Sequence, residues 1–324
     1  MSSRDLKVDT LRGIACIALV FFHAVGTPTT GFRVDEGPLK EFNDFLALIR
    51  MPLFTFLSGY VFAIRPYVSG ETKAYLKGKA RRLLLPLLFA GTIFAVLQSL
   101  TPGTNSAVDD WYLLHIIPVG HFWYIESLFL IFLFVIPLTI LKVLESPIGV
   151  LFVISSFLLL SLGQPYSSYF GFKGFVYLVP FFFTGYAIRY YLVDFDVNRI
   201  LAGLALVALL ASAVWFDYGS VRGLRAMVLG ALFCVLIYTL RLEIPLLARV
   251  GHYSYSIFIY HVFFTAAARI GLEFAIDGYV LYKVIVCTLF GIVGPIVLYR
   301  LFRNIAILRP LAFGEARVIR RPSN

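Results

Sequence analysis

The sequence is poor in charge for its length. Only 14% of its 324 residues are Asp, Glu, Lys or Arg, whereas average soluble domains contain about 25%. Apolar residues make up 60% of the chain, and the mean hydropathy is +0.87. The composition therefore excludes an ordinary water-soluble domain and indicates a protein that resides in a membrane.

Cysteine is also scarce. Cys16, Cys234 and Cys287 are odd in number, lie in apolar runs and show no metal-ligand spacing, which excludes a disulfide scaffold. The chain lacks internal repeats, low-complexity stretches and Gly/Ser linkers. We therefore expect a single domain over residues 1–324, without an appended soluble domain.

Long apolar runs are abundant by contrast. They are too long for barrel strands and do not alternate, which predicts an all-α, polytopic integral membrane bundle of about ten transmembrane helices. The predicted spans cover residues 11–27, 45–64, 83–100, 120–141, 148–163, 173–192, 200–216, 224–240, 253–270 and 279–303. The first resembles a signal peptide, but His23 within it and the lack of a clean cleavage site favour a retained helix.

The net charge of +10 is explained by orientation. With ten spans and the N-terminus inside, twenty of the 28 Lys and Arg residues fall on the inner side and eight on the outer side. This bias predicts a multi-pass protein of the cytoplasmic (inner) membrane with both termini in the cytoplasm. It also removes the need for a nucleic-acid partner.

Two polar residues on the first span form a candidate pair. Arg12 and His23 are eleven residues apart, so they project from one helix face and lie about 16 Å apart along its axis. Arg12 alone is explained by anchoring to headgroups, and His23 alone by a helix–helix hydrogen bond. A pair on one face inside the membrane favours a functional role.

Further polar residues gather in the outer half. His121 and Trp123 open the fourth span, where an interfacial aromatic belt is the alternative explanation, and Glu126 follows further inward. On an unbroken helix His121 and Glu126 do not point together. His261 lies near mid-depth of the ninth span, at the depth of His23, so the two can meet in one cavity. No two His are three or four residues apart, and we expect no metal.

The second span contains Arg50 followed by Pro52, Ser58 and Gly59. A helix kink and close helix packing explain the last three. Arg50 is a cation within the membrane, so we expect it to pair with Asp44, Glu126 or a carboxylate of a ligand.

A basic segment, residues 73–82, precedes the third span and contains Lys79, Arg81 and Arg82. Attraction to anionic lipids is one explanation. The other is a phosphate-binding patch for a cytoplasmic donor that carries a nucleotide. No Walker or dinucleotide-binding glycine motif accompanies the segment.

Five short motifs together resemble the membrane acyltransferase-3 family along nearly the whole chain. In chain order they are Arg12-x10-His23, Met51–Tyr60, Lys79–Pro86, His121–Tyr124 and Gly251–His261. Two features depart from the family pattern: Arg50 stands where relatives often have His, and Glu126 follows Trp123 by three residues instead of five.

The resemblance implies an O-acyltransferase that moves an acyl group from cytoplasmic acyl-CoA to a hydroxyl. The resemblance favours acetyl-CoA as the donor and a surface polysaccharide or a lipid-linked glycan precursor as the acceptor. His23 is the presumed catalytic residue with Arg12 as its partner, either as general base or through an acyl-His. Glu126 is a further catalytic candidate.

Binding roles follow from the same scheme. The anionic phosphates of CoA suit Arg12, Lys79, Arg81 and Arg82. The acceptor is expected to meet Arg50, His121, Trp123, Tyr255 and His261.

Two other functions explain the same composition. A secondary transporter or a translocase of lipid-linked glycans would use intramembrane charges for its substrate or for protons, but the repeats common in transporters are absent. A non-catalytic scaffold explains the bundle but not the Arg12–His23 pair.

Overall fold

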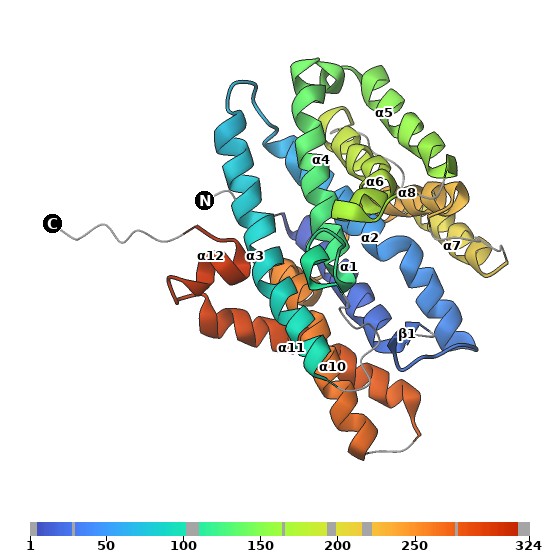
Figure 1. The fold of residues 1–324 in the computed structure, drawn as a ribbon. Helices are drawn as coiled ribbons and strands as arrows, with labels where there is room; N and C mark the ends of the chain where they lie inside the picture. Colours follow the sequence, from blue (N-terminus) through green and yellow to red (C-terminus); the bar gives the residue numbers. More distant parts are fainter. Residues whose placement is uncertain are drawn as a thin grey trace.

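The predicted apolar runs form helices in the computed structural model, which describes residues 5–27, 30–101, 110–163, 166–192, 199–215, 222–275 and 278–316 (Figure 1). The longer helices are α1 (Leu6–Val25), α2 (Pro38–Ile64), α3 (Thr72–Leu100), α4 (Trp123–Ile140), α5 (Pro147–Leu160), α6 (Phe172–Tyr190), α7 (Arg199–Trp215), α8 (Leu224–Thr239), α10 (Ser254–Ala275) and α11 (Val280–Phe302). The short elements are β1 (Gly26–Thr27), β2 (Thr30–Gly31), η1 (Trp111–Leu113), η2 (Gly120–Phe122), η3 (Val143–Glu145), η4 (Ser161–Gly163), η5 (Tyr169–Gly171), α9 (Pro245–His252) and α12 (Leu308–Phe313).

Each of the ten predicted spans falls on one of the longer helices. Within the described residues, seven helices are long and apolar enough to cross a membrane: α1, α2, α3, α4 with η2, α6 with η5, α10 and α11. The helices α5 and α8 are apolar but shorter. The all-α membrane bundle is therefore confirmed. Four basic residues used for the orientation lie outside the described part: Arg4, Arg317, Arg320 and Arg321.

The basic segment before the third span is helical, although the sequence analysis began the third helix only at residue 83. Helix α3 begins at Thr72 and includes all of residues 73–82. Lys, Arg and Ala have high helix propensity, so the apolar run extends backwards as a helix instead of ending at its first charged residue. The basic side chains therefore have defined positions on a helix.

Helix α1 lies inside the bundle, against α2, α9, α10 and α11. Its first turn is capped by Asp5, whose carboxylate accepts a hydrogen bond of 2.9 Å from the Lys7 amide. Glycines allow α9 to approach α1 closely: a Cβ atom at Gly13 would lie 2.0 Å from the Leu247 carbonyl oxygen, and one at Gly251 would lie 1.9 Å from that of Asp9. This contact fixes the end of α1 that carries Arg12.

The helices α2 and α6 pack in the same way. A Cβ atom at Gly59 would lie 1.8 Å from the Phe182 carbonyl oxygen, and one at Gly185 would lie 1.9 Å from that of Phe56. The two backbones are thus in direct contact, and no side chain larger than hydrogen fits at either glycine. The contact holds α2, which carries Arg50, in a fixed position.

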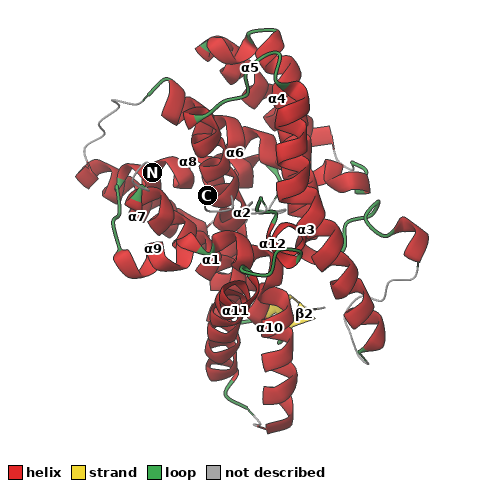
Figure 2. Cartoon of the chain, turned by 90° about the vertical axis from the view of Figure 1, so that its left-hand side faces the viewer, coloured by secondary structure: helices red, strands yellow, loops and turns green. Residues whose placement is uncertain are grey.

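At the end of α1 nearest His23 the chain turns through the β1–β2 hairpin, which the sequence analysis did not anticipate. Asn43 of α2 donates a hydrogen bond of 2.8 Å to the Gly26 carbonyl and ties the hairpin to α2. In Figure 2 the helices α10 and α11 run side by side and project from the rest of the bundle, close to this hairpin.

A second irregular segment precedes α4. The helix begins at Trp123, and His121 lies before it in η2, after Gly120 with a φ of 53°. This positive φ favours glycine and changes the chain direction just before the helix. His121 therefore leaves the regular α4 surface and projects toward α10.

Candidate functional site

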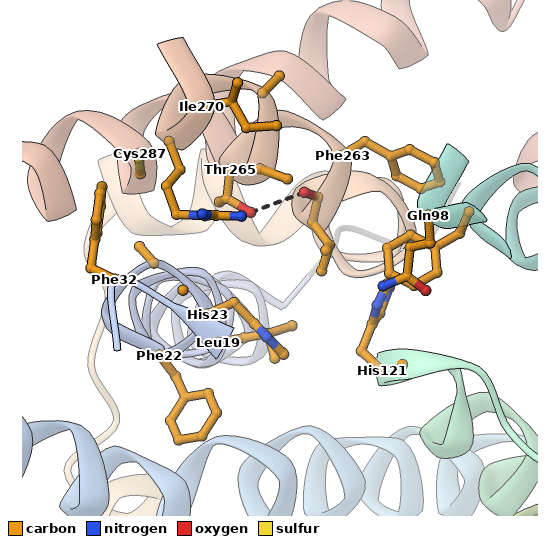
Figure 3. A pocket seen from close by; sticks show the side chains of 18 of the residues that line it. Leu19, Phe22, His23, Phe32, Gln98, His121, Phe263, Thr265, Ile270 and Cys287 are labelled. Atoms are coloured by element: carbon orange, nitrogen blue, oxygen red, sulfur yellow. Dashed lines mark hydrogen bonds between the residues drawn. The ribbon is translucent and has the colours of Figure 1, made fainter. Parts of the chain in front are cut away.

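A large pocket opens among α1, α2, α3, η2 and α10. Its volume is about 1140 Å³, and its lining includes His23, Arg50, His121 and Trp123 together with apolar side chains of α3 and α10. Figure 3 shows His23 and His121 pointing into this space from two separate elements, with Phe22 turned toward α2. Four residues singled out from the sequence thus line one cavity.

Three imidazoles form a cluster at the pocket, which we call the histidine cluster: His23, His121 and His261. The ring centroids are 5.0 Å apart for His23 and His261, 4.9 Å for His121 and His261, and 6.1 Å for His23 and His121. The meeting of His23 and His261 at one depth agrees with the sequence prediction. His23 is partly exposed to the pocket, whereas His261 is fully buried behind it.

Backbone contacts fix the orientation of two of these rings. The Nδ1 atom of His261 lies 2.9 Å from the carbonyl oxygens of Ile257 and Phe258, so Nδ1 carries the proton and Nε2 presents a lone pair. His121 is held by Nε2, 3.2 Å from the Ile259 carbonyl, which leaves its Nδ1 as the acceptor. Among the described residues neither His261 Nε2 nor His121 Nδ1 has a hydrogen-bond partner.

Arg50 lies beside the histidine cluster without the carboxylate that the sequence analysis expected. Its guanidinium carbon is 3.2 Å from the centroid of the Phe22 ring. Within the described ranges Asp44 pairs with Lys40 instead, and the buried Nε atom of Arg50 has no hydrogen-bond partner. Of the partners considered for Arg50, a ligand remains.

Glu126 is not in the pocket. It lies one turn into α4, is 6% exposed and packs against Gly171. Neither carboxylate oxygen has a hydrogen-bond partner in the described part of the chain. Trp123, on the same face of the helix, does line the pocket. The guanidinium carbon of Arg222 lies 4.9 Å from the centroid of the Trp123 ring.

Arg12 and the basic segment lie away from the pocket. Arg12 forms an ion pair with Asp9 at 3.0 Å, eleven residues before His23 on α1 and hence about 16 Å along the helix. Arg81 and Arg82 are exposed on α3. Lys79 is folded over the Phe132 ring, 3.5 Å from its centroid.

Tyr255 belongs with this second group. It lies at the start of α10 and donates a hydrogen bond to the Arg82 carbonyl, which joins α10 to α3. The structure thus places the predicted site residues in two sets and leaves Glu126 in neither. The pocket set is His23, Arg50, His121 and Trp123 with the adjacent His261, and the basic end is Arg12, Lys79, Arg81, Arg82 and Tyr255. No group of three or more His, Cys, Asp or Glu that could hold a metal ion occurs in the described ranges.

The sequence analysis missed two residues that contact the predicted site residues, Asp9 and Arg222. Asp9 could have been found from the sequence, since it precedes Arg12 by three residues and residues at this spacing meet on a helix. Arg222 could not have been found in this way, because only the tertiary fold brings the start of α8 to Trp123 of α4.

A comparison with protein families decides the class of the protein. The model of one family, described as an acyltransferase domain, matches residues 5–300. This chain belongs to the acyltransferase-3 family. No curated protein matches it significantly, and no solved structure does. The family membership and the membrane helices together show a multi-pass membrane acyltransferase, which requires an acyl donor and an acceptor.

The site can be described further in terms of an acyltransferase. Such an enzyme needs a group that accepts a proton, a place for the acceptor and a place for the donor. The pocket set offers imidazoles and a cation at one end of α1, and the basic end offers positive charge for an anionic donor.

Proposed function

We propose that this acyltransferase is an integral membrane O-acyltransferase that uses cytoplasmic acetyl-CoA. Its acceptor is a hydroxyl of a cell-surface polysaccharide or of a lipid-linked glycan precursor. The observation that carries the proposal is the position of His23, which is exposed to a large pocket and backed by two imidazoles of fixed orientation. We place the enzyme in the cytoplasmic (inner) membrane with both termini inside, because basic residues are concentrated on that side.

His23 serves as the general base. It takes the proton of the acceptor hydroxyl while the oxygen attacks the thioester carbonyl, and the C–O bond forms. The tetrahedral intermediate then breaks its C–S bond, and the sulfur of CoA leaves with the proton that His23 returns. The products are the O-acyl acceptor and CoA thiol. A general base of this kind contributes about 10²- to 10⁴-fold to the rate.

His261 positions His23. The Nε2 lone pair of His261 is buried and has no partner among the described residues, and the His261 ring centroid lies 5.0 Å from that of His23, so this lone pair can accept the N–H of His23. His23 then offers its other nitrogen to the acceptor hydroxyl, and the imidazolium that forms is stabilised by the same contact. His121 offers a second lone pair beside it. This scheme gives His261 a positioning role in place of the acceptor contact suggested by the sequence.

The donor binds from the basic end. Arg12, Arg81 and Arg82 are suited to the phosphates of CoA, since guanidinium groups bind phosphate in a bidentate way. The pantetheine arm must then extend about 16 Å along α1 to bring the thioester to His23. Leu19, one turn below His23, lines the pocket at the point where that arm would enter.

The decisive test compares cell-surface glycans of strains with and without the gene by mass spectrometry. Deletion should remove acetyl groups, each about 42 Da, and the wild-type gene should restore them. A His23→Ala gene that reaches the membrane should not restore them. Identical glycan masses with and without the gene would contradict this acceptor class. Transport of a glycan without consumption of acyl-CoA would instead support the translocase alternative.

A further inference from the structure

Arg50 is held in the wall of the pocket by an aromatic ring. Its guanidinium carbon lies 3.2 Å from the centroid of the Phe22 ring. The ring covers a flat face of the guanidinium and leaves the N–H groups at its edge available for hydrogen bonds. The buried Nε–H of Arg50 has no partner in the described residues.

The described part of the chain does not compensate the charge of Arg50. No carboxylate of the described chain pairs with Arg50, since Asp44 is bound to Lys40 and Glu126 lies outside the pocket. Within a membrane bundle such positive charge is costly without a counter-charge.

The remaining charges of the pocket do not supply that counter-charge. Its lining contains three arginines, Arg33, Arg50 and Arg269, but a single acidic residue. That residue is Glu273, which already binds Arg269 at 3.2 Å. Arg50 therefore lines the pocket without a counter-charge from the described residues.

We infer that the acceptor carries an anionic group, a carboxylate or a phosphate, which binds Arg50. The sugar ring packs against Trp123, which also lines the pocket, and its hydroxyl is then presented to His23. This inference rests on the proposed function and narrows its substrate class to acidic glycans. Arg50 would select the acceptor and take no part in proton transfer.

The test uses the full-length protein in nanodiscs with acetyl-CoA and matched acceptors. One pair is a uronic-acid oligosaccharide and its methyl ester, and the other is a glycan with and without a phosphate. We expect wild-type kcat/KM to be at least about tenfold higher for the acidic member of one pair, and that pair identifies the anion. Arg50→Gln should abolish the preference.

Arg225→Gln is the control, because Arg225 is exposed on α8 and is not among the residues that line the pocket, so the variant should leave the preference intact. Arg50→Lys keeps the charge and should retain part of the preference, which guards against a folding defect in Arg50→Gln. A wild-type enzyme that uses acidic and neutral acceptors equally would overturn the inference. An equal loss of kcat/KM for both acceptors in Arg50→Gln would also overturn it, because Arg50 would then act on the oxyanion of the acyl group and not on the acceptor.

Binding separates this inference from the proposed function. Thermal stabilisation of the protein by the acidic acceptor but not by its neutral partner, lost in Arg50→Gln, supports the anion site even if no acyl transfer occurs. Absence of transfer to every acceptor, by contrast, would count against the proposed function alone. Equal stabilisation by both acceptors would overturn the anion site.

Discussion

The imidazole rings of His23 and His261 lie with their centroids 5.0 Å apart, although they come from opposite ends of the sequence. His261 is fully buried, and its Nδ1 is committed to two backbone carbonyls. Its Nε2 atom therefore carries a lone pair, which has no hydrogen-bond partner among the described residues. A histidine that only packs does not need an acceptor at this position, so the identity of the atom at the Nε2 position becomes testable.

Replacing His261 should separate positioning from packing. His261→Gln places an oxygen near the Nε2 position and should keep most of the activity, whereas His261→Phe fills the space and should lower kcat roughly 10²-fold. The KM for the acceptor should change little in both. Steady-state kinetics in nanodiscs measures the two constants separately. Equal kcat values for the Gln and Phe variants would show that His261 only packs.

The opposite preference is expected at His121. Its acceptor atom without a partner in the described residues is Nδ1, which Asn reproduces better than Gln. His121→Asn should therefore keep more activity than His121→Gln, whereas Gln is the substitution expected to keep activity at His261. The same kinetic assay reports both orders. If Gln were the better replacement at both positions, side-chain size and not the position of the acceptor atom would explain the results.

The contact of α2 with α6 predicts a strong effect of a single methyl group. Gly59→Ala would place Cβ 1.8 Å from the Phe182 carbonyl oxygen, so the backbones must separate, and the free energy of unfolding should fall by about 1–3 kcal/mol or more. Gly78→Ala on α3 is the control, since no atom lies within 4 Å of its Cβ position. Thermal unfolding in detergent should show a loss for the first variant and none for the second. Equal unfolding temperatures would contradict the close contact.

The basic end predicts a defect in donor affinity. Arg12→Ala should weaken CoA binding by about tenfold or more, because a charge-assisted hydrogen bond contributes roughly 1.5–3 kcal/mol. Calorimetric titration with CoA measures this without relying on activity. Lys7→Ala is the control, since Lys7 lies one turn earlier on α1 and faces Glu243 at 3.6 Å. Unchanged CoA affinity in Arg12→Ala would leave Arg12 as a membrane anchor paired with Asp9.

Outside the spans, His115 predicts a dependence of stability on pH. Its Nε2 lies 3.0 Å from the Thr92 hydroxyl, and partial burial lowers the pKa of His115 below its usual value of 6.5. The unfolded chain therefore binds this proton more readily, so stability is full above pH 6.5 and falls as the pH drops below it. His115→Gln keeps a hydrogen-bonding side chain and should flatten this fall in thermal unfolding between pH 7.5 and 5.5. An unchanged pH slope in the variant would contradict the assignment.

The helices were predictable because hydropathy alone specifies them. The run that became α1 and the run that became α11 each span a membrane by length and composition, and both appear where expected. The start of α3 was not predictable by the same rule. Its first turns are basic and polar, and helix propensity extends the helix beyond the apolar run.

Within the candidate site, the depth of the side chains along their spans was predictable from the sequence, and the direction in which they point was not. The positions of His23 and His261 in their spans implied a common depth, which the structure reproduces. The orientation of His121 depends on the positive φ of Gly120, and the neighbour of Trp123 depends on where α8 begins. Both are tertiary features without a local sequence signal.

The central claim is that His23 carries the acyl transfer. The most direct measurement follows labelled acetyl from acetyl-CoA to a glycan acceptor with purified His23→Ala and wild-type protein, both shown to be folded by thermal unfolding. The His252→Ala variant, in the exposed end of α9, is the control. We predict that His23→Ala loses about 10²- to 10⁴-fold in kcat while the control keeps its rate. Transfer by His23→Ala at the wild-type rate would contradict the account.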